Sequence, residues 1–247
     1  MIEAHLLCYN EREILPYALR HWTSFCDRVV VHDAFSDDGS RDVATLFGAE
    51  VIDWPTDGIN DILAKQLKER CVMESKADWC AVVDTDELIY FPLGWFHTLA
   101  CYDSAGVAVV RPHGWEMFSE KFPTTTGQIY DEVTMGARDQ KWYGKAVFVA
   151  PQRIRSITFG AGAHSTWANL KDGTKWDNVQ ETTEPETFLL HCKHLGPIDR
   201  AVARYARQQA RHSQTNIKNK FGNFAPPAVH AKEKRDGIIA RLERVIR

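Results

Sequence analysis

Strand-like apolar runs alternate with helix-like segments through the first 112 residues, and this alternation restricts the fold more than any other feature. The strand-like runs are AHLLCY (4–9), RVVVHD (28–33), AEVIDW (49–54), WCAVVD (79–84) and GVAVVRP (106–112). The helix-like segments between them are 12–25, 38–47 and 60–75. A β-α-β-α series of this kind predicts an α/β fold, with a mostly parallel sheet and helices on both faces. The first, second and fourth runs lack polar alternation, which is typical of strands covered on both sides.

The rest of the chain loses this alternation. Residues 113–196 are rich in Gly, Thr, Trp and Phe in their first part and predict an α+β extension of the same domain. Residues 197–247 predict basic C-terminal helices at 197–220 and 232–247, separated by a proline-containing break. We therefore expect one domain in three parts, with boundaries after residues 112 and 196.

Charge is divided unevenly along the chain. The net charge is −3 over 247 residues, and residues 1–192 hold 17 Lys and Arg against 29 Asp and Glu. Residues 193–247 hold 13 basic residues against 4 acidic ones, a net charge of +9. A basic segment of this kind is typical of a surface that meets phosphates, anionic lipid or an acidic partner.

Several features favour the cytoplasm. No apolar run approaches the ~20 residues that cross a bilayer. The N-terminal sequence MIEAHLLCYNERE has neither the basic lead nor the apolar length of a secretory signal. The six cysteines are scattered without a C-x-x-C pair, which indicates free thiols rather than disulfides.

The stretch VVDTDELIY (82–90) places carboxylates at the end of a buried strand. Asp84 and Asp86 lie two residues apart, and oxygen ligands suit Mg²⁺ or Mn²⁺. Such an ion is held by one or two protein carboxylates, with water and substrate phosphates in its other positions. A solvated acidic turn is the other reading of a D-x-D pair, but the position at a strand end favours a metal site.

Other polar residues follow the neighbouring strands, namely Asn10 and Glu11 after the first, Asp33 after the second and Asp53 after the third. Parallel strands end at one edge of a sheet, where open α/β folds bind their ligands, so we expect these side chains to converge. The chain contains no G-x-G-x-x-G after its first strand and no G-x-x-x-x-G-K-[ST], which disfavours a dinucleotide dehydrogenase and a P-loop NTPase.

Two segments resemble family 2-type glycosyltransferases of the GT-A fold, a Rossmann-like α/β fold. CYNEREILPYALRHWTSFCDRVVVHDAFSDDGSRDVA is similar to the opening of those enzymes, and ADWCAVVDTDELIYFP is similar to their Asp-x-Asp segment. KAVFVAPQRIRSITFGAGAHSTW and LLHCKHLG resemble later segments of the same branch more weakly. The resemblance is good over residues 1–92 and patchy to about residue 200.

The resemblance implies a transferase that takes a sugar from a nucleotide-diphosphate sugar. Asn10 and Glu11 would line the nucleotide pocket, and Asp33 would meet the nucleobase edge. Asp84 would lie near the ribose or the metal, and Asp86 would ligate Mn²⁺ or Mg²⁺. Residues 1–112 would then be the nucleotide-sugar-binding half, and 113–196 the acceptor side.

An inverting transferase needs a base that takes the proton of the acceptor hydroxyl. The residues after the metal motif offer Asp131, which we favour, then Glu116, with Glu132 and Asp139 as further candidates. A retaining mechanism would need no such base, and the sequence does not decide between the two.

Histidines and lysines in the second half could complete the site. His164 is a candidate metal ligand or phosphate contact, although a lone histidine is more often structural. His191 is a candidate for the same roles, whereas a zinc site formed with His194 is disfavoured because the two lie on a strand-like piece. Lys145 and Lys193 could neutralise diphosphate charge.

Arg200, Arg204, Arg207 and Arg211 repeat at the spacing of one helix face. The face could simply be solvated, or it could contact an acidic glycan or the anionic inner face of a membrane. Nucleic acid is disfavoured because the preceding part of the chain is acidic.

The sequence thus predicts a metal-dependent glycosyltransferase that moves a sugar to a glycan, a lipid-linked acceptor or a related hydroxyl compound. Two alternatives remain open: a nucleotide- or glycan-binding module without turnover, and a phosphatase with Asp84 as its nucleophile.

Overall fold

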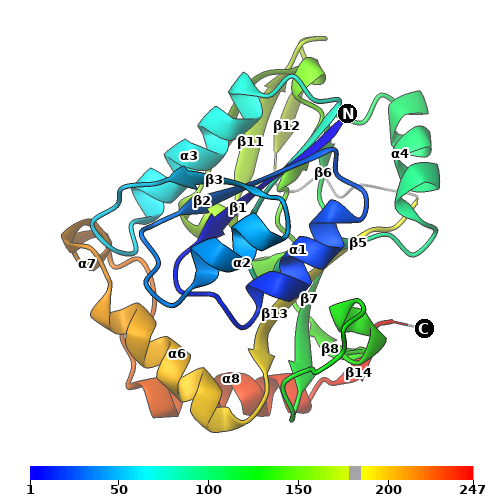
Figure 1. Cartoon of the computed structure of the whole chain (residues 1–247). Coiled ribbons are helices and arrows are strands. Elements are labelled where there is room, and N and C mark those ends of the chain that lie inside the picture. The colour runs from blue at the N-terminus through cyan, green and yellow to red at the C-terminus, as the bar shows by residue number, and fades with distance from the viewer. Residues whose placement is uncertain (178–184, 247) are drawn as a thin grey trace.

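A six-stranded sheet lies at the centre of the computed structural model, which describes residues 1–177 and 185–246 (Figure 1). Its strand order is β3-β2-β1-β4-β9-β6. The strands are β1 (Ile2–Cys8), β2 (Arg28–Asp33), β3 (Glu50–Asp53), β4 (Trp79–Asp84), β6 (Val109–Val110) and β9 (Phe148–Val149). The first four are parallel to one another, and β9 runs antiparallel between β4 and β6. The mostly parallel sheet predicted from the sequence is confirmed.

Helices cover both faces of this sheet. α1 (Leu15–Thr23) and α2 (Ser40–Leu46) lie on one face, and α3 (Asp61–Glu74) lies on the other (Figure 1). Right-handed crossovers require this arrangement, because β2 and β3 extend the sheet to one side of β1 and β4 extends it to the other. β1 and β4 are therefore buried almost throughout, which explains their continuous apolar sequence.

A five-stranded second sheet, with strand order β14-β8-β7-β13-β5, continues from the first. Its strands are β5 (Glu87–Tyr90), β7 (His113–Ser119), β8 (Met135–Arg138), β13 (Phe188–Leu195) and β14 (Glu243–Arg244). β5 follows β4 after a two-residue turn, so the second sheet starts at the edge where the parallel strands end. β13 lies between β5 and β7 and places His191 opposite Glu87 on one side and Glu116 on the other.

The remaining elements of residues 95–177 surround these two sheets. β10 (Ile154–Phe159), β11 (Thr166–Leu170) and β12 (Lys175–Asp177) form an antiparallel meander, and β10 packs against α3. The helices are α4 (Trp95–Ser104) and α5 (Gln140–Tyr143), with 3₁₀ turns at Ile129–Asp131, Pro151–Arg153 and Ala161–Ala163. β9 follows residue 112 in the chain but belongs to the first sheet, and β5 precedes residue 112 but belongs to the second. Each sheet therefore contains strands from both sides of residue 112, which the sequence suggested as a boundary.

Three C-terminal helices replace the two that the sequence predicted. They are α6 (Ile198–Ala210), α7 (Gln214–Asn219) and α8 (Pro227–Ile239). The helix expected over 197–220 breaks because the Ser213 side chain accepts a hydrogen bond from the Asn216 amide and starts a new helix there. The helix expected over 232–247 begins earlier, at Pro227, because proline suits the first helical position. It also ends earlier, and residues 243–244 form β14 against β8.

The sequence predicted the elements of the first 84 residues to within three residues at each end. The run at 106–112 was less well predicted, because only Val109 and Val110 pair as a strand. None of the helices in the described part of the chain is long and apolar enough to cross a bilayer.

Trp79 offers a test of the packing of the central sheet. It is 2% exposed, and its ring stacks on Phe148 with centroids 5.1 Å apart. We expect Trp79→Ala to lower the free energy of unfolding by about 3–5 kcal/mol, because a large buried side chain leaves a cavity. Phe96→Ala is the control, since Phe96 is 74% exposed, and should change stability by less than about 0.5 kcal/mol. Equal urea midpoints for the two variants would contradict the packing described here.

Candidate active site

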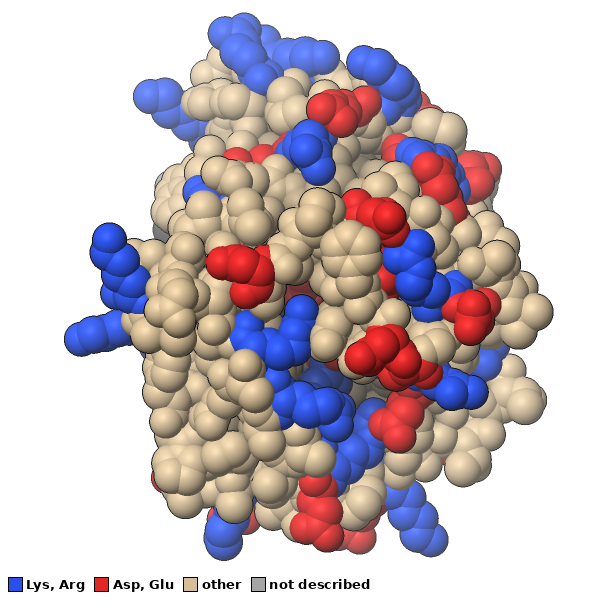
Figure 2. All heavy atoms as spheres, turned by 60° about the vertical axis from the view of Figure 1, so that its left-hand side comes forward, with Lys and Arg blue, Asp and Glu red and all other residues tan. Residues whose placement is uncertain are grey.

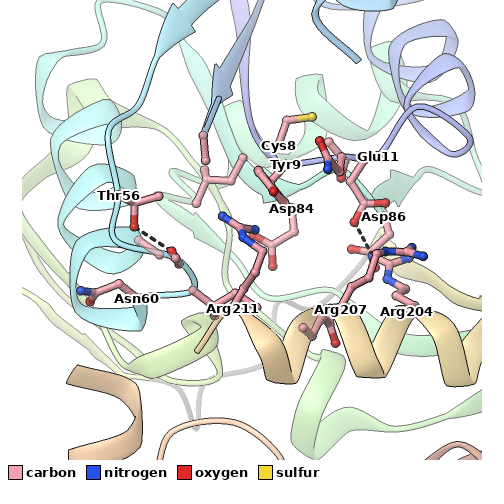
Figure 3. Close-up of a pocket in the computed structure, with 18 of the residues that line it drawn as sticks. Cys8, Tyr9, Glu11, Thr56, Asn60, Asp84, Asp86, Arg204, Arg207 and Arg211 are labelled. Atoms are coloured by element: carbon pink, nitrogen blue, oxygen red, sulfur yellow. Dashed lines mark hydrogen bonds and ion pairs between the residues drawn. The ribbon is translucent and has the colours of Figure 1, made fainter. Parts of the chain in front are cut away.

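The carboxyl edge of the parallel strands opens into a pocket of about 250 Å³. Its lining comes from the ends of β1 and β4, the loop before α3, β13 and α6. Figure 2 shows the hollowed face, where Lys and Arg side chains gather along the opening and Asp and Glu side chains lie nearby. In Figure 3, Arg204 and Arg207 of α6, and Arg211 directly after it, project toward the acidic strand ends across the pocket.

The strand ends bring together four of the residues singled out in the sequence. Leu7 of β1 pairs with Asp84 of β4, so the two strands end almost level. The residues after them, Asn10 and Glu11 on one side and Asp84 and Asp86 on the other, line the same pocket. Their convergence follows from the parallel topology, while the ligand that they bind stays a prediction.

Arg204 joins two of these acids. Its Nη2 atom lies 2.8 Å from Asp86 Oδ2 and 2.9 Å from Glu11 Oε1, and all three side chains lie at least largely out of solvent. Burial by itself raises the pKa of Asp86, but Arg204, followed by His191, holds it well below its ordinary value. Burial raises the pKa of Glu11, and Arg204 only partly offsets this effect. The charge at Asp86 is therefore fixed by a cation from the C-terminal part of the chain.

Asp84 is held by two lysines from different elements. Lys68 Nζ on α3 lies 3.0 Å from Asp84 Oδ1, and Lys145 Nζ lies 4.0 Å from Asp84 Oδ2. Lys145 also makes a short contact with the buried Glu87, whose other oxygen accepts a hydrogen bond from the Asp84 amide. Burial by itself raises the pKa of Asp84, but Lys68 and Lys145 together lower it by more. The pKa therefore lies below its ordinary value, and the carboxylate is ionised at neutral pH. The side chain keeps 43% of its surface exposed toward the pocket.

His191 connects the pocket to a buried acid behind it. Its Nδ1 atom lies 2.9 Å from Glu116 Oε1, and its Nε2 atom lies 3.6 Å from Asp86 Oδ2. Tyr143 stacks on the imidazole with ring centroids 4.1 Å apart. Burial lowers the pKa of His191, but the carboxylates of Glu116 and Asp86 raise it above its ordinary value overall. Glu116 is thus adjacent to the pocket through His191, while Asp131 is not.

Asn10 and Asp33 mainly shape the loop after β2. Asn10 adopts a left-handed backbone conformation, with φ of 53°, and exchanges hydrogen bonds with Asp37 through its side-chain amide. Asp33 is fully buried and accepts hydrogen bonds from Ser36 and Arg41. It is absent from the described lining of the pocket. Its predicted contact with a nucleobase stays a prediction.

Asp131 and His164 lie outside the described lining of the pocket. The Asp131 carboxylate accepts a hydrogen bond from the Gln128 amide, 2.7 Å away, and caps a short 3₁₀ turn. The His164 ring donates through Nδ1 to the Trp142 carbonyl, 2.8 Å away, and burial lowers its pKa to about 4. The predictions that Asp131 is the catalytic base and that His164 is a metal ligand remain predictions.

The sequence did not assign the basic face of α6 to this pocket. Arg204, Arg207 and Arg211 line it, and Arg200 lines a neighbouring hollow. The excess of basic residues after residue 192 could have indicated this position, because the strand ends are acidic and attract basic side chains. Lys68 was also missed, since a lysine within a helix is usually solvent-exposed.

Backbone hydrogen bonds attach the end of α6 to the loop before α3. The Ile59 amide donates to the Arg211 carbonyl at 2.7 Å, and the Ser213 amide donates to the Ile59 carbonyl at 3.1 Å. Asp61 and Asn216 add a side-chain hydrogen bond of 2.6 Å beside them. This attachment fixes α6 over the pocket.

The donor set of Asp84 and Asp86 fits a hard divalent cation that arrives with phosphates. Both carboxylates are ionised and face one pocket, and two carboxylates are the protein ligands that Mg²⁺ commonly uses. The cations of α6 line the same space, which suits a diphosphate bound on the far side of the ion.

No protein-family model matches the chain, and no curated protein sequence matches it. Among solved structures, it is similar to glucosyl-3-phosphoglycerate synthase from Mycobacterium tuberculosis in complex with Mn²⁺, uridine diphosphate and glucosyl-3-phosphoglycerate. That match has 19% identity and a TM-score of 0.35, and covers 46% of this chain and 44% of the other. The same enzyme in complex with phosphoglyceric acid matches with 15% identity and a TM-score of 0.42, covering 66% of this chain and 61% of the other.

Mannosyl-3-phosphoglycerate synthase from Rubrobacter xylanophilus matches with 19% identity and a TM-score of 0.36, and covers 51% of this chain and 43% of the other. The chain therefore spans less than two thirds of the length of each of these structures. These similarities are not used to infer the activity of this chain. That inference depends on the geometry of the pocket.

Two glycines test the attachment of α6. Gly58 has a φ of 111°, and a Cβ added there would lie 2.2 Å from the Arg211 carbonyl oxygen. Gly48 has a φ of 75°, and a Cβ added there would have no atom within 4 Å. Gly48→Ala should cost about 1–3 kcal/mol from backbone strain alone. Gly58→Ala should cost more and should also abolish hydrogen-exchange protection at the Ile59 and Ser213 amides. Retained protection in Gly58→Ala would contradict the attachment.

Proposed function

We propose that this chain is a glycosyltransferase that uses a nucleotide-diphosphate sugar and a divalent cation. One observation carries the proposal: Asp84 and Asp86 share a pocket with Asn10, Glu11 and a row of arginines. Acidic and basic side chains on opposite walls of one cavity suit a ligand in which a cation is bound to a diphosphate. The resemblance of the strand-end motifs to family 2-type glycosyltransferases agrees with this geometry.

The basic wall would bind the diphosphate. Arg207 and Arg211 line the pocket, and Arg211 also lies over the ring of Tyr9. Arg204 already neutralises two acids, and its Nε and Nη1 atoms are buried without a hydrogen-bond partner among the described residues. Arg207 and Arg211 are therefore the main candidates for contact with the phosphates. Guanidinium groups bind phosphate oxygens in bidentate fashion, which makes this wall better suited to a diphosphate than to a neutral sugar.

Asp84 and Asp86 would hold Mn²⁺ or Mg²⁺, which would neutralise the charge that develops on the departing diphosphate. The acceptor hydroxyl oxygen would form a bond to the anomeric carbon as the bond from that carbon to the diphosphate oxygen breaks. His191, whose pKa is raised, would face the diphosphate as a further positive charge. Of the four candidate bases, Glu116 is better placed than the favoured Asp131 to take the proton of the acceptor hydroxyl, because its carboxylate contacts His191, which lines the pocket.

The acceptor would approach through the neighbouring hollow, which has a volume of about 320 Å³. Arg12, Arg200 and Arg207 line it together with Glu13 and Asp38. A mixed but arginine-rich rim favours an acidic glycan or a phosphorylated acceptor, including a lipid-linked one. The arginine face of α6 points toward the pocket. Ligand binding therefore explains it better than contact with a membrane surface does.

Two other functions remain testable with the same protein. A binding module without turnover would bind the nucleotide with metal but would neither transfer nor hydrolyse the sugar. A phosphatase using Asp84 would hydrolyse p-nitrophenyl phosphate, although Lys68 bound to that carboxylate makes it a poor nucleophile.

Substitution of Asp86 tests the cation site. In a thermal-shift screen of uridine, guanosine and adenosine diphosphates and their sugars, we expect at least one compound to stabilise the wild type only with Mn²⁺. Asp86→Asn should abolish the Mn²⁺-dependent part of the shift, since it removes a charged ligand. Asp131→Asn is the matched control and should keep the full shift, despite a lower starting melting temperature from its lost cap. A Mn²⁺-dependent shift that Asp86→Asn keeps and Asp131→Asn loses would contradict the proposed site.

The pKa of Lys193, which lines the pocket, predicts how nucleotide binding depends on pH. Burial, followed by the charge of Arg204, lowers the pKa of Lys193 to about 8. Below that pH the ammonium is charged and attracts a diphosphate, and above it the amine is neutral. The affinity for uridine diphosphate should therefore fall as pH rises through 8, as measured by calorimetry at constant ionic strength. Lys193→Arg should remove this fall, because a guanidinium stays charged. An unchanged fall in that variant would assign the titration to another group.

A further inference from the structure

Three metal-ligating side chains meet on the opposite side of β1 from α1, away from the pocket described above. His5 of β1 and His32 of β2 project from the same face of the sheet, and Cys71 of α3 packs on them. His5 Nδ1 lies 2.9 Å from His32 Nε2, and Cys71 Sγ lies 3.4 Å from the same His32 atom. One atom from each residue lies within 4.8 Å of the others, and all three residues are buried. Buried histidines are less common than buried apolar side chains, so a pair of them beside a cysteine is a candidate for a specific role.

The cluster also has an acid beside it. His5 Nε2 lies 2.8 Å from a carboxylate oxygen of Glu3, while the other ring nitrogen of His5 faces His32. The donor atoms of His5 and Cys71 both approach the same nitrogen of His32, so three atoms that can bind a metal converge at one point.

We propose that His5, His32 and Cys71 bind a borderline-soft divalent transition metal, with Zn²⁺ as the best match. The ion would lie between the three donor atoms, with Glu3 beside the other ring nitrogen of His5.

The dimensions and ligand types suit this ion. Zn–N bonds of about 2.0–2.1 Å and Zn–S bonds of about 2.3 Å place tetrahedral donor atoms roughly 3.3–3.6 Å apart. The observed separations of 2.9 and 3.4 Å need only small side-chain movements to reach this geometry. A carboxylate behind a ligating histidine is a common supporting contact at zinc sites. Imidazole and thiolate donors select zinc over Mg²⁺ or Mn²⁺, which prefer oxygen.

The protonation states of the free cluster also suit metal binding. Burial lowers the pKa of His5 and lowers that of His32 to about 4, so both rings are neutral at pH 7 with lone pairs to donate. Burial raises the pKa of Cys71 to about 12, so the free residue is a thiol. Binding would release the thiol proton, because the thiolate is the form that ligates the ion. One proton should therefore be released for each ion bound.

A cavity of about 480 Å³ borders the cluster and provides access. Glu3, His5, His32 and Cys71 all line it, so the fourth position of the ion can be filled by water. The bound ion would connect β1, β2 and α3, and α3 begins at the pocket on the carboxyl edge. The site is independent of the proposed transferase activity, because it shares no ligand with that pocket.

Cobalt substitution tests the site with the full-length protein. Titration of the reduced, metal-free protein with Co²⁺ should give a thiolate-to-cobalt charge-transfer band that saturates at one equivalent and disappears on adding Zn²⁺. Cys71→Ser should abolish the band, and His5→Gln, His32→Gln or Glu3→Gln should weaken binding at least about tenfold. Cys101→Ser is the matched control, because Cys101 also lies near a histidine, with its Sγ 3.7 Å from His97 Nε2. A band that survives Cys71→Ser, or that is lost in the control, would overturn the proposal.

Two measurements on the unaltered protein keep the proposal testable if a variant fails to fold. X-ray absorption of the protein with one equivalent of Zn²⁺ should show one sulfur and two imidazole nitrogens around the ion. Addition of Zn²⁺ in weak buffer should release one proton per ion. A first shell of oxygen alone, or no binding at micromolar Zn²⁺, would show that the three residues form only a hydrogen-bonded core cluster.

Discussion

The position of α6 depends on the ion pairs that Arg204 makes with Asp86 and Glu11. A guanidinium and two carboxylates are removed from water together, and removing any partner leaves an uncompensated charge at a cost of about 3–5 kcal/mol. The pairing also gives Asp86 and Glu11 a guanidinium partner from the C-terminal part of the chain. The helix that carries Arg204 is therefore part of the pocket rather than an appendage to the sheet.

Asp84 and Asp86 each have cations from other elements. Lys68 on α3 and Lys145 before β9 hold Asp84, while Arg204 and His191 hold Asp86. Such a network is a weak source of net stability, because desolvation offsets much of its Coulomb energy. The network instead fixes the positions of these charges, so that the pocket would need little reorganisation to bind the ligand proposed above.

The elements of the first sheet could be predicted from sequence because their apolar runs are continuous and their turns are marked. The convergence of Asp84 and Asp86 with Asn10 and Glu11 could also be predicted, because parallel topology fixes where strands end. The alignment of His191 with Glu116 could not, since it depends on β13 lying between β5 and β7, and no local pattern encodes that pairing. The break in the basic helix at Ser213 was missed because a helix period continues through it, and a single serine cap decides the outcome.

The bond between Asp61 and Asn216 joins positions 155 residues apart in the chain. The four parallel strands and their helices are complete once residue 84 has left the ribosome, yet the wall formed by α6 is made more than one hundred residues later. During synthesis the acidic strand ends must therefore remain hydrated and without their arginine partners. The nascent sheet can form early, but the pocket is complete only after α6 has been translated and has folded back across the strand ends.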